Sequence, residues 1–344
     1  MLQAQLLLII LFAFSAFMFL STSKKRSVSK TIVMLFFLVV VMLITFRPST
    51  MADYLNYKNT LIDSRYSRFE PGFLLVSALA GKSYVLGFFL IALISLSLKF
   101  FVAWKYKDYF WAIIMVYLSN VIVAQDMVAI RVGVAGSFLL LALLFKLKGE
   151  LMKMTFAIFM AIMFHYTALV LLILFFMDIK KSRRIFYIAL VFASYLMSIN
   201  GIYPTDLMQY FSFMGDIMPL YDAYMLEALY ADTTMNIFNL LQLGHLAVCL
   251  FMWFYIEKIQ LKRKETLLLL KLYSIGICCV PWFAQSFSMA IRFSELFFVC
   301  EILLIPLGFS SIFNNRLYKI VMLLYAVTVF VIRITDMTYW NPVN

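Results

Sequence analysis

The amino-acid sequence predicts an all-α polytopic membrane protein, and three features of composition and charge predict this fold class. The chain of 344 residues is 65% hydrophobic and only 13% charged. A soluble domain of this length would expose large apolar patches to water, whereas lipid is an apolar solvent. Apolar runs recur along the whole chain, and Lys and Arg gather in short clusters between them. We therefore predict a single integral membrane domain over residues 1–344.

Membrane segments are predicted from the lengths of the apolar runs. A spanning helix needs about 20 mostly apolar residues, and the chain holds about 10–12 such segments. Runs that meet or approach this length lie at 2–21, 31–46, 84–104, 109–125, 131–146, 185–199, 236–256, 266–283, 291–312 and 320–335.

The charge pattern predicts which loops lie on which side of the membrane. Cytoplasmic loops carry an excess of Lys and Arg, so we interpret the net charge of +12 as a topology signal and not as a nucleic-acid surface. The basic clusters, expected inside, are Lys24–Lys30, Lys105/Lys107, Lys146–Lys153, Lys180–Arg184, Lys258–Lys264 and Arg316/Lys319. Residues 185–257 contain no Lys or Arg. The alternation of basic and other loops along the chain therefore places the loops 47–83 and 200–235 outside, which is the periplasm if the cell is Gram-negative.

Residues 155–177 do not fit a single crossing. The segment is long enough to span the membrane, yet basic clusters flank both of its ends. One crossing would invert every later loop, whereas a membrane hairpin that enters and leaves from the inside removes the conflict. The hairpin would break near His165–Tyr166, and irregular backbone at that depth requires contact with protein or a water-filled cavity. We therefore predict a polar cavity near His165.

Arginines at the outer ends of helices are candidate anion sites, because guanidinium matches phosphate oxygens with two parallel hydrogen bonds. Arg131 opens the run RVGVAGS, and its alternative partners are Asp126 or a lipid headgroup. Arg292 opens another run and could instead pair with Glu295, three residues on. Lys99, near the inner end of its helix, is expected to extend its ammonium to the interface.

Candidate general bases are Asp53, Glu70 and His165. Glu70 directly precedes Pro71, which favours a helix start with Glu70 at its positive end. Asp53 is four residues before Tyr57, so the two share a helical face. His165 coincides with the predicted break, although a lone histidine on an apolar helix is commonly a packed core residue. His245, the other histidine, is interpreted as structural.

The order of these motifs resembles the EpsG family of bacterial exopolysaccharide proteins, within the broader Wzy class of repeat-unit polymerases. The motifs, in chain order, are Arg47 after the second segment, DYLNY at 53–57, EPGF at 70–73, IRVGVAGS around Arg131, FH at His165, AIRF around Arg292 and YWNP at 339–342. The resemblance covers nearly the whole chain.

The resemblance implies an enzyme that joins oligosaccharide repeat units carried on undecaprenyl pyrophosphate, for O-antigen, capsule or exopolysaccharide. It implies a multi-pass protein of the bacterial inner membrane with its active site facing the periplasm. Further partners would be membrane lipid, a chain-length regulator and a flippase of the same pathway. The residues expected to hold pyrophosphate or substrate are Arg131, Arg292, Arg47, Arg68 and Tyr57.

The expected chemistry is a metal-independent glycosyl transfer without a cofactor. A base would deprotonate the acceptor hydroxyl, and Arg131 and Arg292 would stabilise the leaving pyrophosphate. Among the base candidates, His165 is favoured, because a neutral imidazole is available at about pH 7 and carboxylates beside arginines are weak bases. Glu70 is expected to orient the acceptor or an arginine.

The sequence is also compatible with two functions other than a polymerase. An O-antigen ligase, or another lipid-linked glycosyltransferase, would need the same arginines and a base. A flippase or transporter of lipid-linked sugars would commonly show two repeated halves, and no such repeat is evident in the sequence.

Overall fold

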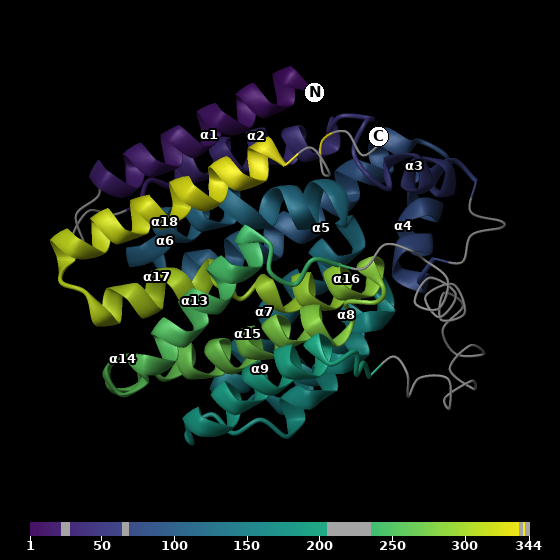
Figure 1. Ribbon diagram of the computed structural model, residues 1–344. Helices are drawn as coiled ribbons and strands as arrows, with labels where there is room; N and C mark the ends of the chain where they lie inside the picture. The colour runs from purple at the N-terminus through teal and green to yellow at the C-terminus, as the bar shows by residue number, and fades with distance from the viewer. Residues whose placement is uncertain (22–27, 64–68, 205–234, 337–339, 341–344) are drawn as a thin grey trace. The chain divides into compact units, whose positions relative to one another are not determined.

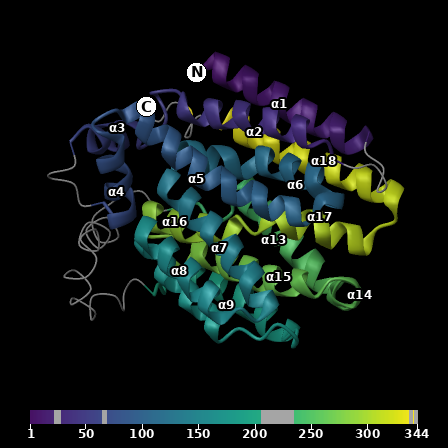
Figure 2. The same cartoon turned by 180° about the vertical axis from the view of Figure 1, so that it is seen from behind.

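The computed structural model describes residues 1–21, 28–63, 69–204, 235–336 and 340, and all secondary-structure elements in this part of the chain are helices (Figures 1 and 2). The elements up to residue 175 are α1 (Leu2–Ser21), α2 (Lys30–Thr45), α3 (Tyr54–Ile62), α4 (Pro71–Ala80), α5 (Tyr84–Lys105), η1 (Lys107–Tyr109), α6 (Phe110–Val116), η2 (Tyr117–Val128), α7 (Ile130–Lys148), α8 (Leu151–Phe164) and η3 (Tyr166–Phe175). The later elements are α9 (Arg184–Ile199), α13 (Leu240–Phe254), α14 (Ile256–Lys262), α15 (Lys264–Trp282), α16 (Phe287–Phe298), α17 (Glu301–Ile312) and α18 (Asn315–Thr335).

The predicted fold class is confirmed, because each of the predicted apolar segments is helical. Six helices are long and apolar enough to cross a membrane, or up to seven if the bent pair Phe287–Phe298 and Glu301–Ile312 counts as one span. The predicted segments 31–46, 185–199 and 236–256 are shorter apolar helices of 16, 16 and 15 residues. A helix of 16 residues rises about 24 Å, less than the roughly 30 Å of a hydrocarbon core.

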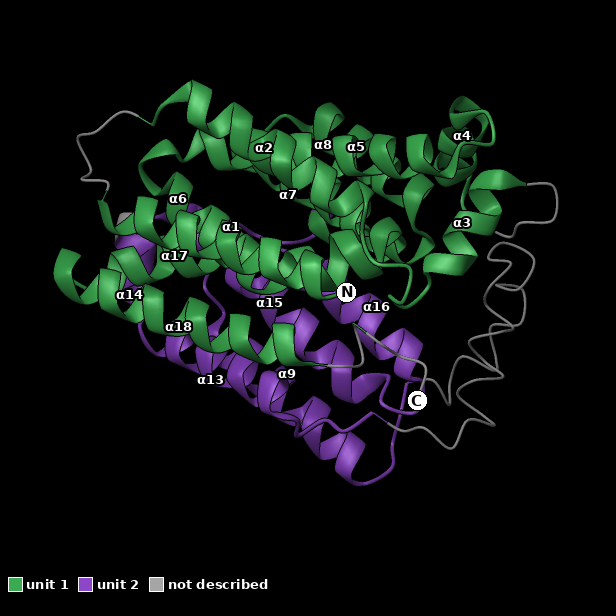
Figure 3. Cartoon of the chain, turned by 90° about the horizontal axis from the view of Figure 1, so that it is seen from above, with its two compact units in different colours: residues 1–174, 301–344 green, residues 175–300 purple. Residues whose placement is uncertain are grey.

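The described residues form two compact units (Figure 3). Unit 1 comprises residues 1–174 and 301–344, and unit 2 comprises residues 175–300. The single domain predicted over residues 1–344 stays a prediction. The predicted outer loop 200–235 lies mostly outside the described residues.

Unit 1 is built around α5, α7 and α8. The helix α7 packs against both α5 and α8, and α2 packs on α5. The chain turns from α7 into α8 at Gly149, whose φ of 74° suits a residue without a Cβ. The helices α1 and α18 lie side by side (Figures 1 and 2), with Phe12 stacked on Phe330 at 4.1 Å. The short helices α3 and α4 pack against each other and against α5.

The predicted hairpin at 155–177 has its break where the charge pattern placed it. The helix α8 ends at Phe164, and His165 has extended backbone (φ −158°, ψ 118°) before η3 begins. The carbonyl of Leu174 then accepts a hydrogen bond from Lys146 Nζ at 2.5 Å. Since Lys146 is in the last turn of α7, the segment begins and ends near the same end of α7, with His165 toward the other end.

Unit 2 packs α9, α13 and α16 around α15. Lys271 of α15 donates hydrogen bonds to the carbonyls of Asp178 (2.5 Å) and Lys181 (2.6 Å), which fixes the basic loop that precedes α9. His245 Nδ1 lies 2.8 Å from the Tyr273 hydroxyl, and its ring stacks on Phe298 at 4.2 Å. These contacts agree with a structural role for His245.

The hairpin makes a labelling prediction. A cysteine introduced as Asp216→Cys should react with an impermeant thiol reagent on intact spheroplasts, whereas Ser182→Cys should react only after permeabilisation, because the Lys/Arg asymmetry places 178–184 inside. The four native cysteines are buried and should give little background. Equal labelling of both positions in intact spheroplasts would show that residues 155–177 do not form a hairpin.

Candidate functional site

A buried carboxylate in unit 1 joins two of the predicted site residues. Glu70 forms an ion pair with Arg131 Nη1 through Oε2, and its Oε1 lies 3.0 Å from His165 Nδ1. The backbone N–H of Tyr166 also donates to Oε1, at 3.3 Å. Glu70, His165 and Arg131 are 1%, 1% and 4% exposed. Residues 70, 131 and 165, far apart in the sequence, therefore form one buried cluster.

Local sequence explains how Glu70 reaches His165. Pro71 occupies the first turn of α4 and Glu70 precedes it with extended backbone, as the sequence predicted. Gly72 then allows α4 to approach the end of α8, because a Cβ on Gly72 would lie 2.7 Å from the Met163 carbonyl oxygen. The extended backbone at His165 turns the chain out of α8 at this contact.

The electrostatics of the cluster define the protonation of His165. Burial by itself would raise the pKa of Glu70, but the charge of Arg131 and the hydrogen bond from His165 outweigh it and lower this pKa to about 2. Glu70 is therefore an anion at neutral pH and can only accept hydrogen bonds. The His165 Nδ1 must carry a hydrogen to donate to it, so a neutral imidazole has its basic lone pair on Nε2.

Arg131 lies against an aromatic wall. It is in the first turn of α7, with its guanidinium 4.2 Å from the Phe69 ring centroid and 5.7 Å from that of Tyr57. Tyr57 is 2% exposed and shares a hydrogen bond with Arg131. The Nε atom of Arg131 has no hydrogen-bond partner among the residues that the structure describes. Arg131 thus retains donor capacity beyond its ion pair with Glu70.

Arg47 is a second buried guanidinium, and its charge is not paired in the described part of unit 1. It is 3% exposed and lies over the ring of Phe88 at 3.8 Å and near that of Tyr54 at 5.7 Å. None of its three nitrogens has a hydrogen-bond partner among the described residues. Burial lowers the pKa of Arg47 to about 10, so it remains a cation at neutral pH. Burying a charge without a partner is costly, so Arg47 is a candidate anion-binding residue.

The structure brings together four of the predicted residues, Glu70, Arg131, His165 and Tyr57, and buries Arg47 in the same unit. Asp53 precedes α3 in the left-handed conformation (φ 60°), and its carboxylate accepts a hydrogen bond from Asn56 at 3.2 Å. Its catalytic role stays a prediction. Arg292 is half-buried in α16 of unit 2, and Arg68 lies outside the described residues.

Two expectations about pairing in unit 1 are wrong. Asp126, an alternative partner for Arg131, instead pairs with Lys99 at 2.7 Å. Lys99 does not extend to the interface and is 2% exposed. The sequence held one signal for this pair, because an acidic residue inside an apolar run needs a cation at its own depth.

A second set of hydrogen-bonded polar side chains in unit 1 lies around Glu301. Asn120 Nδ2 donates to Glu301 Oε2 at 2.6 Å, and Asn120 Oδ1 accepts from Arg333 Nε at 2.5 Å. The indole of Trp340 donates to the Arg333 carbonyl at 3.2 Å. An asparagine thus joins the carboxylate to an arginine, as the high cost of an isolated ion at this depth requires.

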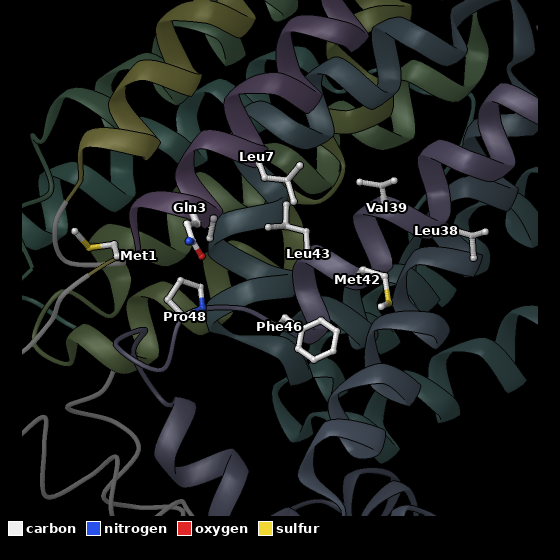
Figure 4. A pocket seen from close by; sticks show the side chains of 10 residues that line it. Met1, Gln3, Leu7, Leu38, Val39, Met42, Leu43, Phe46 and Pro48 are labelled. Atoms are coloured by element: carbon white, nitrogen blue, oxygen red, sulfur yellow. The ribbon is translucent and has the colours of Figure 1, made fainter.

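Two grooves on the surface of unit 1 are lined mainly by apolar residues, and their linings include none of Glu70, Arg131 and His165. One, with a volume of about 460 Å³, lies between α1 and the end of α2 (Figure 4). Its lining includes Leu7, Met42, Leu43, Phe46 and Pro48. Such a surface suits an alkyl or isoprenoid chain, and no charged side chain lines it.

Among the described residues, no group of three or more His, Cys, Asp or Glu side chains is placed to hold a metal ion. The cluster of Glu70, His165 and Arg131 combines an oriented imidazole with one buried guanidinium group.

Comparison with known proteins gives one positive result. A family model described as the EpsG family matches residues 30–342. No curated protein and no solved structure matches the chain.

Proposed function

Because the chain belongs to the EpsG family, we propose that it joins oligosaccharide repeat units carried on undecaprenyl pyrophosphate at the outer face of the bacterial inner membrane. Membership of this family indicates a polysaccharide polymerase, an enzyme of the glycosyltransferase type. The observation that carries the proposal is the buried cluster of Glu70, His165 and Arg131 in unit 1.

His165 is the proposed base. A sugar hydroxyl is a poor nucleophile at neutral pH, so its proton must leave as it attacks. Glu70 accepts a hydrogen bond from the Nδ1–H of His165 and so orients the imidazole ring. The Glu70 carboxylate also stabilises the imidazolium that forms when His165 Nε2 takes the proton of the sugar hydroxyl. The Tyr166 N–H and the Arg131 guanidinium hold the Glu70 carboxylate in turn.

The transfer is a displacement at the anomeric carbon of the growing chain. The acceptor oxygen forms a bond to this carbon while the bond from the carbon to the pyrophosphate oxygen breaks. The electron pair leaves on the pyrophosphate, and the acceptor proton passes to His165. Undecaprenyl pyrophosphate is released, and His165 returns its proton to solvent.

The arginines supply the positive charge that the leaving group needs, so the proposed transfer is metal-independent. Arg47 is the stronger anchor, because it has no carboxylate partner among the described residues, whereas Arg131 is neutralised by Glu70. Fixed guanidinium groups in a dry site stabilise developing negative charge more strongly than water does.

The direct test uses the purified protein in liposomes, with EDTA and lipid-linked repeat units of the producing strain. A polymerase converts the units into a ladder of longer lipid-linked chains and releases undecaprenyl pyrophosphate, while protein-free liposomes do not. Transfer only to an added lipid A–core acceptor would indicate a ligase. Movement of units across the bilayer without a new glycosidic bond would indicate a flippase, and either result would overturn the proposal.

A further inference from the structure

A network of buried polar side chains lies in unit 1 in addition to the Glu70 cluster. Lys99 of α5 reaches both oxygens of the Asp126 carboxylate, at 2.8 and 2.7 Å. The same carboxylate accepts hydrogen bonds from Ser95 Oγ at 2.5 Å and from the Tyr117 hydroxyl at 2.9 Å. All four side chains are 3% exposed or less. The network therefore joins α5 to the π-helix η2.

The network also holds the first turns of α7. The Gly133 carbonyl accepts hydrogen bonds from Ser137 Oγ (2.8 Å) and Lys99 Nζ (3.2 Å), and Ser95 Oγ lies 3.2 Å from it. A Cβ on Gly133 would lie 2.6 Å from Asp126 Oδ1, so only glycine permits this approach. Gly133 is two residues after Arg131, and the network thus fixes the helical turn that carries Arg131.

The path from Asp126 to Arg131 contains a backbone break. The helix η2 has π geometry, which is rare and frequent at functional sites. It ends at Val128, and Ala129 (φ −88°, ψ 61°) separates it from α7. The network therefore holds the chain on both sides of Ala129, at Asp126 and at Gly133, and Arg131 lies between these two contacts.

A stabilising role alone does not account for a buried ion pair in this place. Desolvation offsets most of the attraction between such charges, and apolar replacements of similar volume are often neutral or stabilising. The charge of Asp126 is also felt by Arg47, where it opposes the effect of burial on the arginine pKa.

We propose that Lys99 and Asp126 are positioning residues of the polymerase site, which hold the first turn of α7 so that Arg131 meets both Glu70 and the leaving pyrophosphate. The inference rests on the proposed function. A displacement of about 1 Å at a catalytic group can reduce turnover by roughly 100-fold, so a small shift of α7 is sufficient.

The test compares single, double and swapped variants. Lys99→Met or Asp126→Leu leaves one buried charge unpaired, and each should lower both thermal stability and activity. The double variant Lys99→Met/Asp126→Leu should regain a wild-type melting temperature but keep a kcat reduced about 10- to 100-fold with little change in KM. The swapped variant Lys99→Asp/Asp126→Lys should recover part of that kcat. Lys271→Met, a buried lysine of unit 2, is the matched control and should keep its kcat.

Full kcat in the folded double variant would overturn the inference, because the network would then be structural only. A second measurement separates this failure from failure of the proposed function. Amide hydrogen exchange at residues 129–133 should accelerate in the double variant whether or not the protein polymerises sugars. If the wild-type protein does not polymerise, the proposed function fails, and unchanged exchange at 129–133 would overturn the positioning role as well.

Discussion

Replacing His165 with glutamine is expected to reduce polymerisation by about 10²- to 10⁴-fold, the usual contribution of a general base. Glutamine keeps a donor toward Glu70 but cannot accept the acceptor's proton at any pH. Since the pKa of Glu70 is about 2, the carboxylate stays ionised over the working range and does not restore activity at low or high pH. The measurement is initial rate against pH in the liposome assay, with binding of the lipid-linked unit determined separately and expected to be unchanged.

Two further variants complete this experiment. His245→Gln is the matched control, because His245 is also buried and hydrogen-bonded, to Tyr273 in unit 2, and it should retain near-normal turnover. Glu70→Gln should also be slow, since it removes both the orientation of the imidazole and the counter-charge of Arg131. If His165→Gln retains turnover while Glu70→Gln is inactive, Glu70 is the base and His165 is a packed core histidine.

Replacing Arg47 with alanine is expected to weaken binding of the lipid-linked substrate by about 10- to 100-fold, the loss of ~1.5–3 kcal/mol for hydrogen bonds to a charged group. The same change should leave the melting temperature of the substrate-free protein equal or higher, because it removes a buried charge with no partner among the described residues. Arg47→Lys should restore binding in part, since an ammonium lacks the planar fork. Calorimetric melting and equilibrium binding, measured on the same samples, give both quantities.

Arg131→Ala, in contrast to Arg47→Ala, should lower the melting temperature of the substrate-free protein. It leaves Glu70 buried beside His165 without its main counter-charge, and breaking such a pair typically costs about 3–5 kcal/mol. Arg184→Ala, at the half-buried start of α9 in unit 2, serves as the control. It should change neither the melting temperature nor the binding of the lipid-linked substrate. Unchanged binding of the lipid-linked substrate by Arg47→Ala would mean that Arg47 is not the anion anchor.

Most of the long apolar helices of this protein follow from its sequence to within a few residues. The predicted run 2–21 is α1 (Leu2–Ser21), and the run 84–104 is α5 (Tyr84–Lys105). Even the break at His165 was predicted, because basic clusters on both sides of 155–177 are incompatible with one crossing. These features are local, since they depend on the length of an apolar run and on the charges at its ends.

The site is predictable only in part. The sequence identified Glu70, Arg131 and His165 separately, as polar groups that are costly near lipid. It did not show that these three residues contact one another. It gave Asp126 as an alternative partner of Arg131, and it predicted that the Lys99 ammonium extends to the membrane interface. Length alone does not show which runs cross the membrane fully, since the run 31–46 is a helix of 16 residues.

The sequence by itself determined that this chain is a helical membrane protein, where its long apolar helices lie, and which rare polar residues require an explanation. Only the tertiary structure decided that Glu70 bonds to His165 and Arg131 at once, that Lys99 neutralises Asp126, and that Arg47 is buried without a partner among the described residues. The physical reason is that a charge in an apolar interior is paired by whichever group lies within about 4 Å. That distance is set by how α4, α5, α7 and α8 pack, through close approaches such as those at Gly72 and Gly133, and not by separation along the chain.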